Sequence, residues 1–192
     1  MTSTSPLVPA FLKLAGRAVL LVGGGKVAAS KLPALLEAGA RVTVVSPEIG
    51  HDLLRPGVRL LQRGFLPVDL DGKWFAVAAA PPEVNREVSA AAEQRGIFVN
   101  AVDDAASASA YLGGVVRRGS VTLAISTDGR APALAGLLRE ALDAMLPADV
   151  ADWADLAERL RDGWRSAGVP FGDRRPLLLH ALQQLYSRRG AA

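Results

Sequence analysis

VLLVGGGKVAASK, from Val19 to Lys31, is the stretch of sequence that decides the fold of this chain. It starts with an apolar run of strand length, and three glycines follow directly. Gly23, Gly25 and Ala28 fit the pattern G-x-G-x-x-G/A, whose small residues allow a tight turn, a close backbone approach to a pyrophosphate and close helix packing. The stretch predicts a strand, a turn and a helix whose free N–H groups face a phosphate. A plain tight turn is the alternative.

Apolar runs of strand length alternate with helical patterns along the chain, which is typical of βαβ units and a parallel sheet. We therefore predict an α/β fold with a Rossmann-like parallel sheet. Pro33 lies inside the first predicted helix, and we expect a kink there because proline removes a backbone hydrogen bond. Strands are expected near residues 18–22, 41–45, 58–62, 75–79, 97–101 and 121–125, and helices near 27–37, 83–95 and 132–145.

Composition excludes several classes of protein. The 192 residues, half of them hydrophobic, suffice for one domain or two small ones. The absence of cysteine rules out disulfides and cysteine metal sites, and His51 and His180 lack the spacing of metal ligands, so no metal site is predicted. No apolar stretch reaches the roughly 18 residues of a membrane span, and Met1–Pro9 does not resemble a signal peptide. We expect a cytoplasmic protein without membrane contact.

The net charge of the chain gives only a weak indication of its ligand. The 22 Lys and Arg exceed the 19 Asp and Glu by only three, which weakly suggests an anionic ligand. Aromatic residues make up only 5% of the chain, and no basic helix or finger motif is present, so nucleic acid is not an expected partner.

The second predicted strand ends in Val44-Val45-Ser46-Pro47-Glu48. In most dinucleotide-binding folds an acid near this point binds the adenosine ribose. Glu48 is the nearest candidate, and its carboxylate would repel a 2′-phosphate and favour NAD over NADP. Arg41 and Arg55 weaken that inference, since either could reach the same neighbourhood. A solvated loop glutamate is the alternative.

Two carboxylates, Asp103 and Asp104, follow the fifth predicted strand. Ligands of such folds bind outside the carboxyl ends of the strands. A carboxylate there, partly desolvated beside a cofactor, could serve as a base. The alternative is that one of the two only caps the following segment.

A further junction between strand and helix carries Ser126, Thr127 and Arg130 before Pro132, a residue suited to a first helical turn. Two hydroxyls and a guanidinium beside free N–H groups could hold a carboxylate. An ordinary polar turn is the alternative.

Taken together, these residues resemble the precorrin-2 dehydrogenases of sirohaem synthesis, which include the amino-terminal part of bacterial sirohaem synthase and its fungal counterpart. The resemblance runs from about residue 9 to Pro147 in the family's order. It rests on PAFLKL, VGGGKVAASK, LLEAGARVTVVSPE, VNREVSAAAEQRGIFVNAVDD, VVRRGSVTLAIST and GRAPALAGLLREAL.

The resemblance implies a homodimer that uses NAD to oxidise precorrin-2, a tetrapyrrole, to sirohydrochlorin; some family members also insert ferrous iron. It implies an NAD-binding Rossmann domain at 1–112, a central dimerisation segment at 113–146 and a helical carboxyl-terminal domain at 147–192. A chain that ends at Ala192 is not expected to carry the methyltransferase half of the fused synthases.

The family's catalytic aspartate falls on Asp103, and the serine near its tetrapyrrole site falls on Thr127. Ser126, Arg117, Arg118 and Arg130 are the other predicted substrate residues, because Arg pairs well with carboxylates; Arg139 is a less secure candidate. The predicted cofactor contacts are Gly23, Gly24, Gly25, Lys26, Val27, Pro47, Glu48, Ala79, Ala80 and Asn100.

The sequence departs from the family at Ala80-Pro81-Pro82, Ala110 and Gly113, in loops of the predicted substrate cleft, which makes iron insertion less certain than oxidation. Two alternatives remain: an NAD-sensing regulatory module without chemistry and an oxidoreductase with a small substrate. Near the carboxyl terminus, apolar residues recur at helical spacing and predict a helix that forms core, dimer interface or a cleft wall. They are Trp153, Leu156, Leu160 and Trp164.

Overall fold

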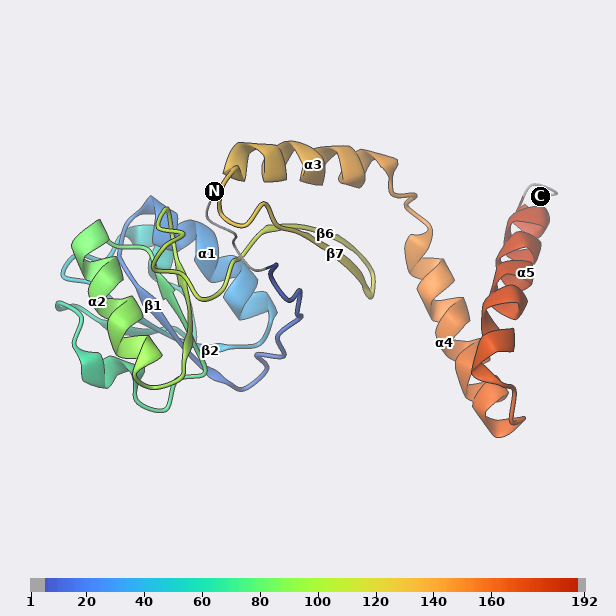
Figure 1. Ribbon diagram of the computed structural model, residues 1–192, viewed down its shortest axis with the longest axis horizontal. Coiled ribbons are helices and arrows are strands. Elements are labelled where there is room, and N and C mark those ends of the chain that lie inside the picture. Colours follow the sequence, from blue (N-terminus) through green and yellow to red (C-terminus); the bar gives the residue numbers. More distant parts are fainter. Residues whose placement is uncertain (1–5, 190–192) are drawn as a thin grey trace. The chain divides into compact units, whose positions relative to one another are not determined.

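The computed structural model describes residues 6–189, with side chains described as far as residue 184. The chain divides into two compact units (Figure 1). Unit 1 comprises the residues up to 112 together with 126–132, and unit 2 comprises 113–125 together with the residues from 133 onward.

Unit 1 is built on one parallel sheet of five strands in the order β3-β2-β1-β4-β5. This topology confirms the predicted α/β fold with a Rossmann-like sheet. Its elements are β1 (Ala18–Val22), α1 (Lys26–Glu37), β2 (Arg41–Val45), β3 (Arg59–Leu61), β4 (Phe75–Ala78), α2 (Pro82–Glu93) and β5 (Phe98–Ala101), with short 3-10 helices η1 (His51–Leu53) and η2 (Pro67–Leu70).

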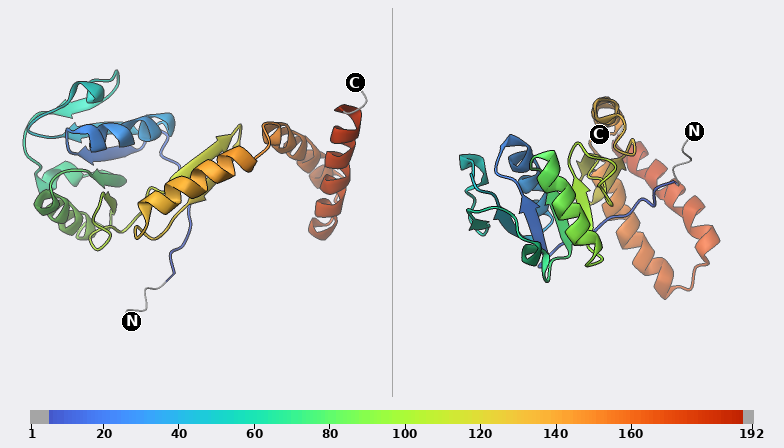
Figure 2. Two further views of the ribbon diagram at one scale, coloured as in Figure 1. Left: turned by 90° about the horizontal axis from the view of Figure 1, so that it is seen from above. Right: turned by 60° about the vertical axis from the view of Figure 1, so that its left-hand side comes forward.

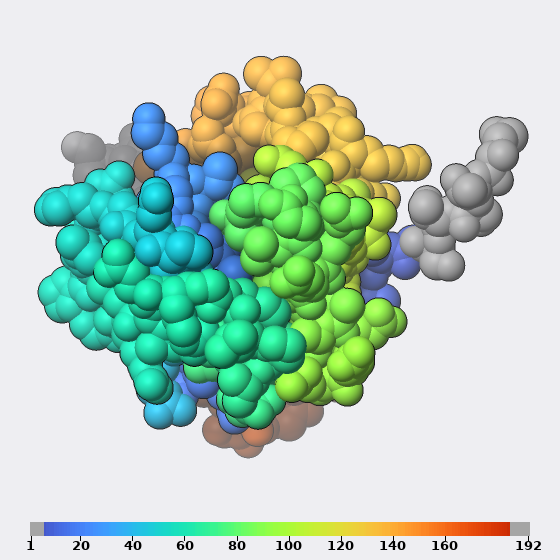
Figure 3. Space-filling model, turned by 90° about the vertical axis from the view of Figure 1, so that its left-hand side faces the viewer, coloured from blue at the N-terminus to red at the C-terminus, as the bar shows by residue number. Residues whose placement is uncertain are grey.

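The alternation of side chains along β1 explains the layers of unit 1. Val19 and Leu21 join the buried cluster that includes Leu32 of α1. Leu20 and Val22 join the cluster that includes Val88 of α2. Since successive strand residues point to opposite faces, α1 and α2 cover opposite sides of the sheet (Figure 2). Figure 3 looks onto the α2 side, where α2 (green) lies against η2 (teal).

Pro33 lies within α1 without ending it. The residue is exposed, so the carbonyl group that it leaves without an N–H partner is on a side of the helix that water can reach. The helix therefore continues to Glu37. The kink predicted at Pro33 stays a prediction.

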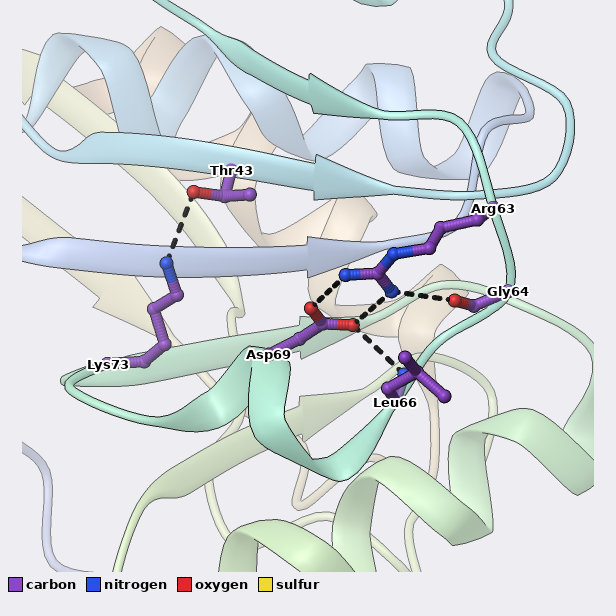
Figure 4. A network of polar contacts seen from close by, with 6 residues as sticks. All are labelled: Thr43, Arg63, Gly64, Leu66, Asp69 and Lys73. Carbon is purple, nitrogen blue, oxygen red and sulfur yellow. Dashed lines mark hydrogen bonds and ion pairs between the residues drawn. The ribbon is translucent and has the colours of Figure 1, made fainter.

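A charged pair closes the loop after β3 (Figure 4). Arg63 donates to Oδ2 of Asp69 at 2.8 Å, and the Leu66 N–H donates to the same oxygen at 2.9 Å. The hydrogen bond from Arg63, with a smaller contribution from the Leu66 N–H, lowers the pKa of the buried Asp69 carboxyl. Nearby, Lys73 donates to the Thr43 hydroxyl at 3.2 Å, and burial is the main cause that lowers the pKa of Lys73.

Unit 2 begins with an antiparallel pair, β6 (Gly114–Arg118) and β7 (Val121–Ile125). The sequence predicted β7 among the strands of the parallel sheet, which is wrong, and it did not predict β6. The antiparallel pair forms its own two-stranded sheet because the tight connection through Gly119 suits a hairpin and not a crossover. The remaining elements are α3 (Pro132–Met145), α4 (Val150–Ser166) and α5 (Phe171–Arg189).

The predicted helix around Trp153, Leu156, Leu160 and Trp164 is confirmed as part of α4. All four side chains are half-buried. Helix α4 packs against α5, so these apolar residues belong to a pair of packed helices.

Candidate functional site

The strands of unit 1 are in a register that brings their carboxyl ends together. Val22 of β1 lies opposite Val45 of β2 on one side and opposite Ala78 of β4 on the other, and Ala78 lies opposite Ala101 of β5. The chain runs from β1 to β2 and β3 in one direction and later to β4 and β5 in the other. The point between β1 and β4 is therefore a topological switch point, where ligands of open α/β sheets bind.

The glycine turn after β1 lies at this switch point. A Cβ atom on Gly23 would collide with the backbone carbonyl of Ala79, and one on Gly24 would collide with the carbonyl of Glu48. Gly23 also has φ +125°, a conformation that other residues rarely adopt. A Cβ on Gly25, in contrast, would meet no atom within 4 Å. The turn is closed on two sides and open at Gly25.

The open side of the turn faces the start of α1. Gly25 is the N-cap of the helix and brings no side-chain hydrogen bond to its first turn. Lys26 and Val27, the first residues of α1, are exposed. Uncapped N–H groups at a helix start attract a phosphate group. The turn therefore fits the pyrophosphate of a dinucleotide, and the predicted contacts Gly23–Val27 lie together.

The loop after β2 wraps the glycine turn. Gly50 donates its N–H to the Gly24 carbonyl at 2.9 Å, and the backbone of Glu48 lies against Gly24. Pro47 and Glu48 are exposed. The predicted contacts from this loop therefore lie beside the glycine turn. Gly24, which is not one of the patterned small residues, is needed for this packing.

Two arginines, Arg41 and Arg55, were expected to be able to reach the neighbourhood of Glu48. Arg41 begins β2, at the opposite edge of the sheet from the glycine turn, and its Nε donates to the Gly16 carbonyl at 3.0 Å. Arg55 donates to the Asp52 carbonyl at 3.3 Å. The expectation that Arg41 could reach the neighbourhood of Glu48 is wrong, because Arg41 lies at the amino end of β2 whereas Glu48 follows its carboxyl end, and the Arg41 side chain is hydrogen-bonded to Gly16.

Two buried asparagines support the loops after β4 and β5. Asn100, a predicted cofactor contact, donates through Nδ2 to the Ala110 carbonyl at 3.1 Å. Asn85 of α2 accepts from the Ala80 N–H at 3.0 Å and donates to the Val102 carbonyl at 3.3 Å. Asn85 was not predicted as a site residue, since its two partners lie in loops that only the fold brings to it.

The two carboxylates after β5 have different roles. Asp104 accepts from the Ser107 N–H at 3.2 Å and from its hydroxyl at 2.7 Å, and the hydroxyl bond is the main cause of its lowered pKa. Asp104 thus takes the capping role that the sequence left open for either residue. Asp103 is exposed and has φ +58°, a strained conformation for a residue with a side chain.

The loop with Thr127 lies beside the loop with Asp103, and both belong to unit 1. A Cβ on Gly129 would contact the ring of Tyr111 and the side chain of Ala105. The Tyr111 hydroxyl donates to the Ala105 carbonyl at 3.0 Å. Tyr111 therefore joins the two loops, a role that no sequence motif predicted.

Within its loop, Thr127 holds the turn that precedes α3. The Ala131 N–H donates to the Thr127 hydroxyl at 3.3 Å, and the Asp128 N–H donates to the Ser126 hydroxyl at 3.1 Å. These bonds match an ordinary polar turn, and both hydroxyls keep the ability to donate to a ligand. Arg130 is exposed in the same loop.

The other candidate arginines lie in unit 2. Arg118 forms an ion pair with Asp143 at 2.8 Å, and it also donates to the carbonyls of Arg117 and Asp143. Arg139 pairs with its neighbour Glu140 at 3.1 Å on the surface of α3. Arg118 is thus part of the link between β6 and α3, and Arg117 is exposed on β6.

Among the described residues, no three His, Cys, Asp or Glu side chains are grouped in a way that could hold a metal ion. A search of the same residues finds no helix with the length and apolar character that a bilayer crossing requires.

Comparisons with known proteins agree with this geometry. Residues 10–114 match the family described as putative NAD(P)-binding, and residues 118–145 match the central region of sirohaem biosynthesis proteins. Siroheme synthase 2 of Aeromonas hydrophila is 43% identical over an alignment of 171 residues that covers 88% of this chain and 36% of that protein. Siroheme synthase of Photorhabdus laumondii is 41% identical over 81% of this chain and 34% of its own length. The chain thus spans about a third of these relatives.

Among solved structures, SirC, a precorrin-2 dehydrogenase, superposes with a TM-score of 0.68 and 25% identity over 91% of this chain and 88% of that one. The NAD(P)-binding match spans more than half of the 192 residues, and its glycine turn is the one that leaves no room for a Cβ at Gly23 and Gly24. The chain therefore belongs to the putative NAD(P)-binding family and, like the sirohaem synthases, carries the sirohaem biosynthesis central region directly after it.

Proposed function

We propose that this protein oxidises precorrin-2 to sirohydrochlorin with NAD as the hydride acceptor. One observation carries the proposal: the glycine turn, the Asp103 loop and the Thr127 loop all belong to unit 1, and the last two loops pack together through Tyr111 and Gly129. The names of the relatives, siroheme synthase and precorrin-2 dehydrogenase, support the same substrate.

The residues at the carboxyl edge of the sheet would hold the dinucleotide. The N–H groups at the start of α1 would bind the pyrophosphate, while Ala79, Ala80 and Asn100 would line the crevice on the β4 and β5 side. When bound, the nicotinamide supplies hydride acceptance. Glu48 lies beside the turn, and its carboxylate would favour NAD over NADP because it would repel a 2′-phosphate.

The protein must also remove a proton and hold a substrate with many carboxylates. Asp103, exposed at the end of β5, is the proposed base: its carboxylate oxygen accepts the proton that the macrocycle loses with the hydride. Ser126, Thr127 and Arg130 would bind substrate carboxylates from the neighbouring loop. Arg117 and Arg118 remain predictions for the same role.

Unit 2 would provide the contacts between two copies of the chain. Residues 113–146 would form the dimerisation segment and 147–192 a helical carboxyl-terminal domain. The exposed leucines of α3 support an apolar interface, since Leu134, Leu137 and Leu138 all lie on it with much of their surface open. Because the proposed reaction draws on an intracellular dinucleotide pool, the cytoplasm is the proposed location.

An anaerobic assay with precorrin-2 and NAD tests the proposal, with NADH formation as the readout. The wild-type protein is expected to form NADH, whereas Asp103→Asn should lower kcat at least ~100-fold because the base is lost. NAD affinity and the unfolding midpoint should not change. Asp104→Asn is the matched control, since it keeps an acceptor for Ser107 and should lose only a few-fold.

No NADH from the wild-type protein would contradict the oxidation and favour a regulatory or small-substrate role. Full activity of Asp103→Asn would contradict the assignment of the base. Ferrous or cobaltous ion added after the oxidation shows whether the same protein also inserts a metal.

A further inference from the structure

Asn85 is a buried polar residue to which the proposed chemistry assigns no role. Its side chain is 3% exposed and belongs to the face of α2 that packs on the sheet, together with Val88, Ser89 and Ala92. A polar side chain in such a place costs free energy unless it is hydrogen-bonded. The hydrogen bonds of the Asn85 side chain therefore indicate what the residue does in the fold.

Both ends of the Asn85 amide are used. Its Oδ1 accepts from the Ala80 N–H at 3.0 Å, in the loop after β4, and its Nδ2 donates to the Val102 carbonyl at 3.3 Å, in the loop after β5. An amide offers an acceptor and a donor on one rigid plane, which neither a carboxylate nor an apolar side chain can do. Asn85 thus joins two loops that are 22 positions apart in the sequence, as the numbers of Ala80 and Val102 show.

Both of these loops border the proposed reaction centre. The residue before Ala80 is Ala79, whose carbonyl lies against Gly23 of the glycine turn. The residue after Val102 is Asp103, with its left-handed backbone at φ +58°. Asn85 therefore connects the wall of the cofactor crevice with the residue next to the proposed base, although it belongs to neither.

We propose that Asn85 is a positioning residue: through its two hydrogen bonds it fixes the loop carrying Asp103 relative to the crevice wall at Ala79 and Ala80. The inference rests on the proposed function in that it takes Asp103 as the base. A displacement of about 1 Å between reacting groups can lower a rate ~100-fold, so the fixed spacing matters more for turnover than for binding.

Three variants test this role. Asn85→Asp keeps the size and the acceptor for the Ala80 N–H, but its ionised carboxylate has no donor for the Val102 carbonyl. Asn85→Leu loses both bonds. Ser89→Ala is the matched control because Ser89 lies one turn further along the same buried face. Its hydroxyl has no hydrogen-bond partner among the described residues.

The expected result is a split between kcat and binding. Asn85→Asp should lower kcat about 10-fold or more with NAD affinity within about 2-fold of wild type, because the bond that holds Ala80 remains. Asn85→Leu should lower both kcat and NAD affinity. Amide hydrogen exchange of residues 79–82 and 101–104 should become faster in this variant. Ser89→Ala should leave kcat, affinity and exchange unchanged.

Wild-type kcat in Asn85→Asp, or a loss no larger than in Ser89→Ala, would overturn the proposal. If Asn85→Leu does not fold, Asn85→Asp carries the test because it is nearly isosteric. Failure of the proposed function is recognised separately: a wild-type protein without NADH formation would remove the reaction, while the exchange and NAD-affinity results on the Asn85 variants would still show whether the two loops are held.

Discussion

The sheet of unit 1 buries most of its apolar side chains on both faces, whereas most apolar side chains of unit 2 that the structure describes remain in contact with solvent. In unit 1 two buried clusters occupy the two sides of the sheet. Among the described residues of unit 2, the buried apolar side chains are Val116, Ala135 and Val150. Leu137 and Met145 of α3 are 65% and 76% exposed.

The difference indicates how each unit obtains its stability. Burial of apolar surface is the main favourable contribution to folding, and unit 1 achieves it within a single chain. Unit 2 exposes side chains of the kind that form interfaces. A second copy that covers α3 is the partner that the proposed homodimer requires.

The largest effect is expected from a charge placed on α3. Leu137→Glu would bring a carboxylate into the proposed interface twice, because a two-fold dimer repeats each substitution. We expect the dimer dissociation constant to rise roughly 1,000-fold, measured by analytical ultracentrifugation. Val68→Glu, at an exposed position of η2 in unit 1, is the control and should leave the dimer unchanged. A wild-type protein that is already monomeric would remove the proposed role of unit 2.

A methyl group on the glycine turn tests the packing of unit 1. Gly24→Ala would press a Cβ against the Glu48 carbonyl, so the free energy of unfolding should fall by about 2–3 kcal/mol. Gly25→Ala places its methyl group in open space and should keep stability within about 0.5 kcal/mol. It should still weaken NAD binding, because the pyrophosphate approaches there. Urea unfolding measures the stability of each variant, and NAD titration measures its affinity for the dinucleotide. Equal stability of Gly24→Ala and Gly25→Ala would contradict this account of the turn.

A smaller effect is expected at the Arg63–Asp69 pair of unit 1. Asp69→Asn should lower the free energy of unfolding by about 1–2 kcal/mol, since the carboxylate is buried and accepts from Arg63 and Leu66. Asp71→Asn, in the exposed pair with Arg95, should change it little.

The pH dependence of this difference follows from the lowered pKa of Asp69. A lowered folded-state pKa means that the stabilisation is complete above the pKa of an unfolded aspartate, about 3.9. It is lost as the pH falls through the lower folded value. The gap in unfolding midpoint between wild type and Asp69→Asn should therefore be constant near neutral pH and shrink below about pH 4. A gap that persists unchanged in acid would contradict the ionic contribution.

The sequence was sufficient for the elements whose signals are local. Residues 18–22, 41–45 and 121–125 are strands with the predicted bounds, and the predicted helix 132–145 is α3. The apolar runs and the proline at the first turn of α3 are signals that lie within the elements themselves. The glycine turn could be predicted for the same reason, because its pattern encodes a local geometry.

What the sequence could not predict depends on partners far along the chain. β6 contains Arg117 and Arg118 and no alternating apolar pattern, so only its pairing with β7 makes it a strand. Gly24 is required by Glu48, and Asn85 by two loops that are distant in sequence. The candidate site was predicted partly from local patterns, such as the glycine turn and the carboxylates after β5, and partly from a family resemblance. The side chains that hold its loops became visible only in three dimensions.

The chain leaves unit 1 at Leu112 and returns to it with Ser126–Pro132, which has a practical consequence for anyone who wishes to isolate the nucleotide domain. A fragment cut after Leu112 would lack seven residues of its own compact unit, those from Ser126 to Pro132. The ring of Tyr111 would then lose its neighbour Gly129. A fragment that contains the whole of unit 1 needs a short linker that replaces β6 and β7 and joins Leu112 to Ser126.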